Sequence, residues 1–164
     1  MKDNNLTTQT IGLALQEAGL HPYIKGINCC GIHRGGDDYE VFTERLPVIY
    51  IRKTVSVDLF DWRDNKGILA CAVNVFNAKP FPVRAVIGYD TIAFMLNTEM
   101  VSEEHFSARI IPWLDQIEEA LGLFGLCCAM VVRDWEKDDL DKLTKQVSDT
   151  NTHNPWLKGQ KTSW

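Results

Sequence analysis

The pattern of apolar and polar residues is clearest over residues 67–101. Five apolar residues at helical spacing predict a short amphipathic helix: Ile68, Leu69, Ala72, Val73 and Phe76. We expect this helix to end near Ala78, because Pro80 and Pro82 cannot donate backbone hydrogen bonds. Apolar and polar residues then alternate over residues 83–87 and 92–96, which predicts two paired strands. The residues between these runs, Gly88 to Asp90, are typical of a turn.

Two further helices are predicted near the ends of the chain. The first covers residues 6–18, with Thr7 and Thr8 at its start. The second begins after Ser102, a good N-cap, and continues past Leu121 with helical spacing. Pro112 predicts a kink or a break near Ile111, since proline removes one backbone hydrogen bond.

The pattern is less decisive at the C-terminal end. Residues 123–132 are apolar on all sides, which fits a buried helix or a buried strand, and we favour the helix. Residues 134–147 predict a surface helix. Residues 148–164 are polar apart from a few large side chains, and we expect a poorly ordered tail.

Residues 39–62 read as strands, because β-branched and aromatic residues are dense there. We predict strands over residues 39–42, 48–51 and 55–60; one long bent strand is the alternative for this region. Residues 23–38 are glycine-rich and loop-like, with room for one short strand over 27–32. The predicted fold is α+β: an antiparallel sheet of about five strands with helices packed on one face, in the order α-β-β-β-α-β-β-α. We expect one domain over residues 1–147.

Composition narrows the classes of function. The chain has 164 residues, 45% of them hydrophobic, which is enough for a sizeable core. A net charge of -5, without clustered Lys and Arg, disfavours nucleic acid as a partner. We expect no signal peptide and no membrane span, since the longest apolar run, residues 121–132, is too short. We therefore expect a cytoplasmic protein whose five cysteines are reduced.

One group of residues could bind a metal or perform thiol chemistry: Cys29, Cys30, His33, Cys127 and Cys128. Zinc sites usually separate paired ligands by two residues, and thioredoxin-like motifs have the same gap, whereas these cysteines are adjacent. Packing is the favoured role, and a thiol- or metal-dependent protein is the alternative. We identify no catalytic residue, no metal ligand set and no cofactor motif.

The predicted strands carry apolar side chains on both faces. Five of them form a candidate partner or dimer surface on the face turned away from the helices: Tyr50, Phe60, Trp62, Val86 and Met95. We expect these apolar side chains to be shielded from water by another element or chain. A second copy of the chain, its own C-terminal segment or another protein could each shield them.

The order of elements resembles the YbjN family. The likeness rests on the segment Ala72-Val73-Asn74-Val75-Phe76-Asn77, on the strand pair after it and on the helix at Phe106, and it spans residues 6–124. That family is described as regulators of bacterial sensory transduction, and it is similar in fold to type III secretion chaperones. The resemblance implies a non-enzymatic module, able to form a dimer, that binds a segment of another protein along its sheet or helices.

Overall fold

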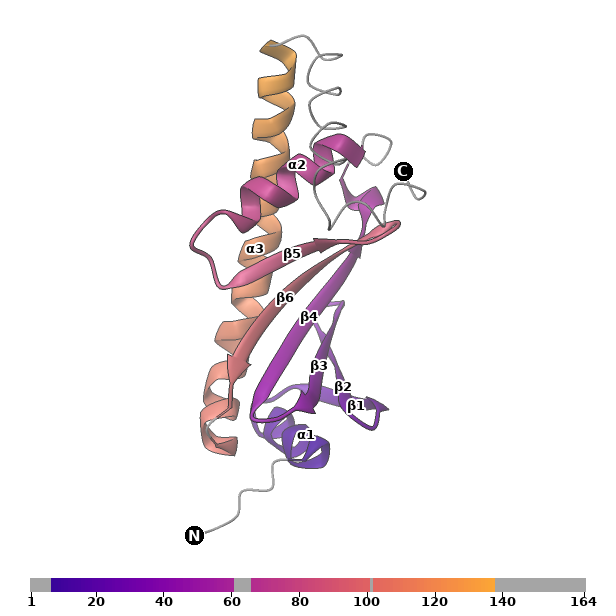
Figure 1. Ribbon diagram of the computed structural model, residues 1–164. Helices are drawn as coiled ribbons and strands as arrows, with labels where there is room; N and C mark the ends of the chain where they lie inside the picture. The colour runs from indigo at the N-terminus through magenta and orange to yellow at the C-terminus, as the bar shows by residue number, and fades with distance from the viewer. Residues whose placement is uncertain (1–6, 61–65, 101, 138–164) are drawn as a thin grey trace. The chain divides into compact units, whose positions relative to one another are not determined.

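The computed structural model describes residues 7–60, 66–100 and 102–137, with only the backbone described for 135–137 (Figure 1). The elements, in chain order, are α1 (Thr8–Glu17), β1 (His21–Gly26), β2 (Cys29–Arg34), β3 (Asp37–Arg45), β4 (Val48–Ser56), the 3-10 helix η1 (Val57–Leu59), α2 (Lys66–Asn77), β5 (Val83–Ile87), β6 (Thr91–Glu99) and α3 (Glu103–Lys137). Trp62, which is predicted to belong to the partner or dimer surface, lies outside the described residues, and so does the predicted domain boundary at residue 147.

The strands form one antiparallel sheet in the order β1-β2-β3-β4-β6-β5. The predicted α+β class is confirmed, with six strands in place of about five. The glycine-rich region contributes two strands, the β1–β2 hairpin, and not a loop with a single strand, while the strand predicted over residues 55–60 is absent, so the total rises from five to six. Gly35 and Gly36, with φ of 60° and 82°, form the turn into β3, and positive φ is a conformation that glycine adopts freely. Glycine here marks a tight turn within the sheet.

The separate strand predicted over residues 55–60 is wrong. β4 continues to Ser56 and is followed by η1, and the β3–β4 hairpin also contradicts the alternative of one long bent strand over residues 39–62. The side chain of Ser56 accepts a hydrogen bond from the Asp58 amide at 3.2 Å and caps this turn. This run of β-branched and aromatic residues therefore ends in a helical turn. β propensity depends strongly on context, and the local cap outweighs it here.

The two shorter helices match the prediction. Thr7 is the N-cap of α1, and its side chain and that of Thr10 bond each other's backbone amides at 3.3 and 3.2 Å, a capping box. Gly19, with φ of 81°, follows the end of the helix. α2 ends at Asn77, one residue before the predicted stop.

α3 is one helix of 35 residues with Pro112 inside it, so the predicted break is wrong, and the alternative of a kink stays a prediction. Ile110, Trp113 and Leu114, on both sides of the proline, are all buried, and this packing offsets the lost backbone hydrogen bond. Residues 123–132 are helical, as favoured. The predicted surface helix beyond residue 137 and the predicted tail lie outside the described residues. No helix in the described part of the chain has the length and apolar character to cross a membrane.

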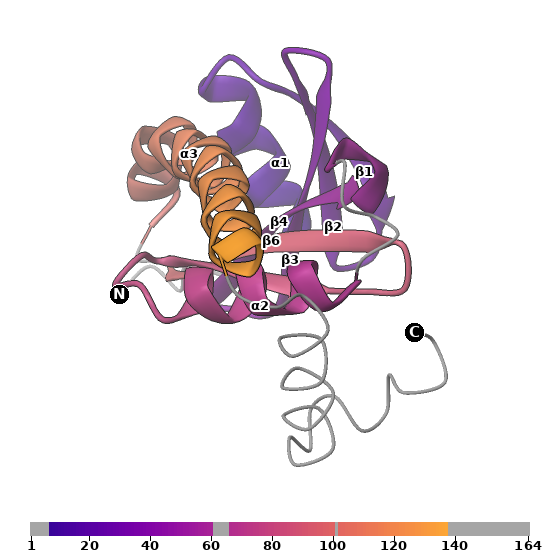
Figure 2. The ribbon, with the colours of Figure 1, turned by 90° about the horizontal axis from the view of Figure 1, so that it is seen from above.

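The described residues fall into two compact units. Unit 1 comprises residues 7–54, 82–84, 94–100 and 102–120, and unit 2 comprises residues 55–60, 66–81, 85–93 and 121–137. In unit 1, α1 and the first part of α3 lie side by side (Figure 2), joined by a hydrogen bond of 3.0 Å from the Ser107 hydroxyl to the Ala14 carbonyl. They cover one face of the strands, where Val41, Ile49 and Ile51 are fully buried.

Unit 2 has an aromatic core. The rings of Phe60 and Phe76 meet Phe124 edge-on, with centroids 5.1 and 6.0 Å apart. Phe76 also contacts Phe81 at 6.3 Å. Edge-to-face pairs add stability beyond the area they bury, so α2 is held on α3 by shape as well as by hydrophobicity.

Candidate protein-binding surface

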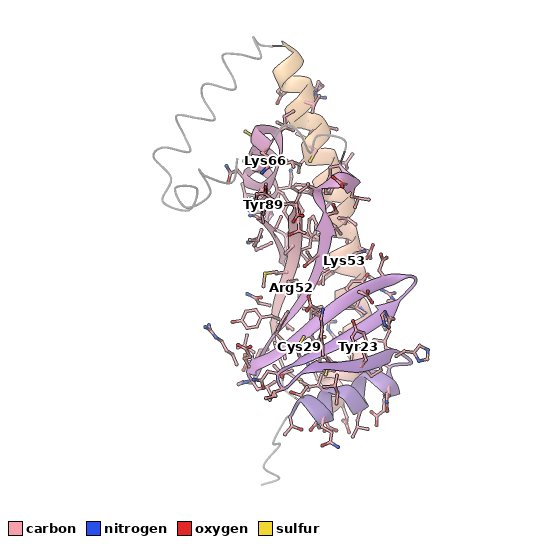
Figure 3. The ribbon with its side chains drawn as sticks, turned by 90° about the vertical axis from the view of Figure 1, so that its right-hand side faces the viewer. Tyr23, Cys29, Arg52, Lys53, Lys66 and Tyr89 are labelled. Carbon is pink, nitrogen blue, oxygen red and sulfur yellow. The ribbon has the colours of Figure 1, made fainter. Side chains whose placement is uncertain are left out.

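The period of two in β3 and β4 sorts the side chains of unit 1 onto two faces. Tyr39, Val41 and Thr43 of β3 are buried under the helices, and so are Ile49, Ile51 and Lys53 of β4. The residues between them point the other way and stay partly exposed. We call this side the open face of unit 1; it carries Tyr23, Lys25, Cys29, Glu40, Phe42, Tyr50, Arg52 and Met95. Among the described residues, no helix covers it, and Figure 3 shows Tyr23, Cys29 and Arg52 on this side.

An arginine on the open face is held in place by its neighbours. Arg52 donates to Glu40 Oε1 from Nε at 3.1 Å and from Nη2 at 2.8 Å, and its guanidinium lies 4.6 Å from the centre of the Phe42 ring. Glu40 also pairs with the Lys25 ammonium at 2.9 Å. Burial raises the pKa of Glu40, but the hydrogen bonds from Arg52 and Lys25 outweigh it, so the pKa is lowered overall. Glu40 is thus an anion that holds two cations on the surface.

A second arrangement on this face depends on a missing side chain. The ring of Tyr23 lies over Gly31, where a Cβ would come within 2.1 Å of Tyr23 Cζ. The same ring stacks on His33 with centroids 4.7 Å apart. Gly31 therefore allows the tyrosine to lie flat on β2, and any larger residue would displace it.

A pocket of about 400 Å³ is hollowed in the open face beside Arg52. Its lining residues are Phe42, Glu44, Arg45, Tyr50, Arg52 and Met95. Phe42 and Tyr50 are cross-strand partners, and Met95 comes from β6, which neighbours β4 in the sheet. The pocket combines an apolar floor with two guanidinium groups, a composition common where one protein segment binds another.

The structure brings together two of the residues predicted for the partner surface, Tyr50 and Met95. Val86 is 49% exposed on β5 and belongs to unit 2. Phe60 is a correction: it is buried against Phe124, because the turn at η1 ends the alternation on which its outward position was based. Trp62 lies outside the described residues.

Sequence reasoning missed Phe42, Arg52 and Arg45 as members of this surface. The alternation within residues 39–42 places Phe42 on the same face as Glu40, and the register of the β3–β4 hairpin pairs it with Tyr50. The run of strand residues therefore contained a signal for Phe42. Arg45 carried none, since its position depends on an irregularity in β3.

The helix-covered face of unit 1 contains a polar cluster around the buried side chains of Lys53 and Tyr39. Lys53 pairs with Glu118 of α3 and lies 3.2 Å from Asp37, and Tyr39 donates a hydrogen bond to Glu118. Burial and this hydrogen bond raise the pKa of Tyr39 well above its ordinary value. The ammonium of Lys53 also lies 5.4 Å from the centre of the Tyr39 ring. These contacts tie α3 to β3 and β4, which is a structural role.

The cysteines do not form a shared site in either unit. In unit 1, Cys29 lies on the open face, whereas Cys30 points to α1 with its Sγ 3.5 Å from the Thr8 carbonyl. In unit 2, burial raises the pKa of Cys127, and raises that of Cys128 to about 12. Within residues 7–60, 66–100 and 102–134, no group of three or more metal-ligating side chains comes together.

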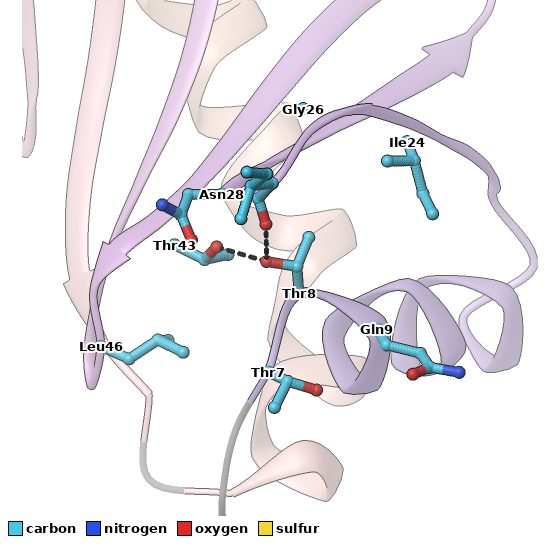
Figure 4. Close-up of a pocket in the computed structure, with 9 residues that line it drawn as sticks. Thr7, Thr8, Gln9, Ile24, Gly26, Asn28, Thr43 and Leu46 are labelled. Atoms are coloured by element: carbon cyan, nitrogen blue, oxygen red, sulfur yellow. Dashed lines mark hydrogen bonds between the residues drawn. The ribbon is translucent and has the colours of Figure 1, made fainter.

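A second pocket, of about 580 Å³, lies between the start of α1 and the β1–β2 hairpin (Figure 4). The Thr8 hydroxyl bonds the Ile27 carbonyl at 2.7 Å and the buried Thr43 hydroxyl at 2.9 Å, which closes one wall. Ile24 and Ile27 line the pocket and are 80% and 91% exposed. Among the residues that the structure describes, no charged side chain lines this second pocket, in contrast to the first, so it offers no ion pair by which to select a partner.

Two solved structures share the fold. One is YbjN from E. coli, described as a candidate transcription regulator, with a TM-score of 0.52 and 14% identity over 74% of this chain and 91% of that chain. The other is an uncharacterized protein from Methanothermobacter thermautotrophicus, with a TM-score of 0.50 and 12% identity over 77% and 99%. No protein-family model and no curated protein matches the sequence. The predicted resemblance to the YbjN family is confirmed at the level of the fold.

Proposed function

We propose that this chain is a non-enzymatic, cytoplasmic protein-binding module, of adaptor, chaperone-like or regulatory kind, that receives a segment of another protein on the open face of unit 1. The observation that carries the proposal is the pocket formed by Phe42, Tyr50 and Met95 beside Arg52. Three large apolar side chains gather there on a face that no described helix covers.

Several side chains on the open face of unit 1 are held rigidly, which favours binding. Arg52 is held by Glu40 and Phe42, and Tyr23 is held over Gly31, so these side chains lose little conformational freedom when a partner arrives. A rigid floor with aromatic and arginine groups is the composition of binding hot spots. The shared fold with a candidate regulator agrees with this role.

A selection from a random peptide library on the immobilised protein tests the proposal. Selected peptides should bind the parent protein and lose at least about tenfold in affinity with Met95→Glu, because the new carboxylate would need to be desolvated in the pocket. Leu126→Glu is the matched control: Leu126 is an exposed apolar residue on α3, 62% accessible, and its replacement should leave affinity unchanged. Tyr50→Ser provides a second, uncharged change in the same pocket.

Two outcomes would contradict the proposal. One is that no peptide is enriched, or that enriched peptides bind Met95→Glu and Tyr50→Ser as well as the parent. The other is that the protein sediments as a dimer that Met95→Glu converts to monomers, which would assign the face to a second copy of the chain. Thermal melts of both variants establish that each is folded before its affinity is compared.

A further inference from the structure

An irregularity in β3 shapes the pocket on the open face. Phe42 pairs with Tyr50 and Arg45 with Val48, so the register shifts by one residue between these pairs. In a regular strand, Glu44 and Arg45 would point to opposite faces, yet both line the pocket. The extra residue of a bulge re-aims a side chain in this way. Arg45 is thereby added to a pocket that already contains Arg52.

The two arginines differ in how they are held. Arg52 is bonded to Glu40 through Nε and Nη2, and its Nη1 makes no hydrogen bond within the described residues. Arg45 is exposed, and it has no ion pair with any residue that the structure describes. Both therefore have donors available, and guanidinium groups prefer carboxylates because their N–H groups can form two parallel hydrogen bonds.

The charge around the pocket is opposite to that of the chain. Of the charged residues that line the pocket, Arg45 and Arg52 are cations and Glu44 is an anion, which gives the lining a net charge of +1 in a chain with net charge -5. Glu44 limits how acidic a partner can be, because a run of carboxylates would meet it. The pocket is therefore suited to a single carboxylate bordered by apolar groups.

We propose that the pocket binds an extended segment of another protein in which an Asp or Glu is followed, two residues later, by a large apolar side chain. In an extended segment, residues two apart point to the same side, so both side chains would face the sheet. The carboxylate would meet Arg45 and Arg52, and the apolar side chain would pack on Phe42 and Met95. This inference rests on the proposed function and adds the chemistry of the partner.

Synthetic peptides test the inference directly. The probe is a short, fluorescently labelled peptide with Glu and, two residues later, Phe in a background of Ser and Thr. Its binding is measured by fluorescence anisotropy against three matched peptides, in which Glu is replaced by Gln or Lys, or Phe by Ser. The parent protein should bind the Glu and Phe peptide about tenfold more tightly than the Gln peptide, and more tightly still than the Lys peptide.

Changes in the protein identify the residues that recognise the carboxylate. In the Arg45→Gln protein, the logarithm of the affinity ratio between the Glu peptide and the Gln peptide should fall to half of the parent's value or less. The Arg45→Glu protein should bind the Lys peptide more tightly than the Glu peptide. Arg45 is exposed, so both variants should fold. Arg109→Glu, an exposed change on α3 with the same effect on net charge, should keep the parent's preference.

The results separate this inference from the proposed function. If peptides from the random library bind in a manner sensitive to Met95→Glu, but Glu and Gln peptides bind equally, the chemistry assigned to the partner is wrong and the binding role stands. If no peptide binds the pocket at all, both are wrong. If the preference for Glu survives Arg45→Glu, the assignment of the carboxylate to Arg45 is overturned.

Discussion

The side-chain amide of Asn77 forms two hydrogen bonds with the backbone of Ala85, accepting from its N–H at 2.9 Å and donating to its carbonyl at 2.9 Å. Asn77 is the last residue of α2, and Ala85 lies in β5, the strand at the end of the sheet order. The amide therefore satisfies the backbone hydrogen-bonding groups of one residue in an edge strand, as a neighbouring strand would. Protected edges resist unwanted pairing with other chains.

Asn77→Ala should lower the free energy of unfolding by about 1–3 kcal/mol, because Ala85 is buried and its backbone groups would lose their partners. The matched control is Asn74→Ala, an exposed change one turn earlier on the same helix, which should shift stability little. Urea unfolding of the three proteins measures the effect. Equal losses in the two variants would mean that the bonds to Ala85 contribute nothing particular.

Phe76→Ala should lower the free energy of unfolding by about 3–5 kcal/mol. Phe76 is fully buried and contacts both Phe81 and Phe124, so its removal leaves a cavity in unit 2. Val75→Ala, at a position 36% exposed on the same helix, should cost far less. Thermal melts compare the two, and a Phe76→Ala protein that melts within a degree or two of the parent would show that this ring does not anchor α2.

Thiol labelling should divide the cysteines by burial. At neutral pH, Cys29 and Cys71 should react slowly, and Cys30, Cys127 and Cys128 only after unfolding, since burial raises the pKa of each thiol. Mass spectrometry of digests after timed alkylation gives the order. Rapid reaction of Cys127 or Cys128 in the folded protein, or metal retained through purification, would favour the thiol- or metal-dependent alternative.

Acid should weaken the ion pairs of Glu40. The pKa of Glu40 is lower in the folded protein than in the unfolded chain, so its pairing with Arg52 and Lys25 stabilises the fold above the unfolded pKa. That stabilisation is lost as the pH falls through the folded pKa. The difference in free energy of unfolding between the parent and Glu40→Gln should thus shrink from neutral pH to about pH 3. Glu119→Gln, an exposed change on α3, is the control; a constant difference for Glu40→Gln would contradict the account.

Local signals along the chain were enough to predict most helices and the β5–β6 pair. Thr7 and Gly19 mark the two ends of α1, and Pro80 and Pro82 follow the end of α2. Such residues act through their own backbone geometry, so neighbours in the sequence suffice to interpret them. The continuity of α3 through Pro112 was not predictable in the same way, because it depends on packing on both sides of the proline.

The candidate site depended on relations between strands, which the chain's periodicity does not contain. Tyr50 and Met95 were predicted from alternation within their own strands, and both line the pocket. Phe60 was misplaced because the alternation stops at Ser56. Arg45 reaches the pocket only through the register shift in β3, and a shift of one residue exchanges the faces of every side chain beyond it.

The methyl resonances of the methionines test the central claim, that the open face of unit 1 binds a protein segment, most directly. With methyl-labelled methionine, a peptide selected on the protein should shift the signal of Met95, which lines the pocket. Met100, which is 2% exposed, and Met130, which is 42% exposed on α3, should keep their positions. A peptide that binds and shifts Met130 while leaving Met95 unchanged would place the binding surface elsewhere and contradict the account.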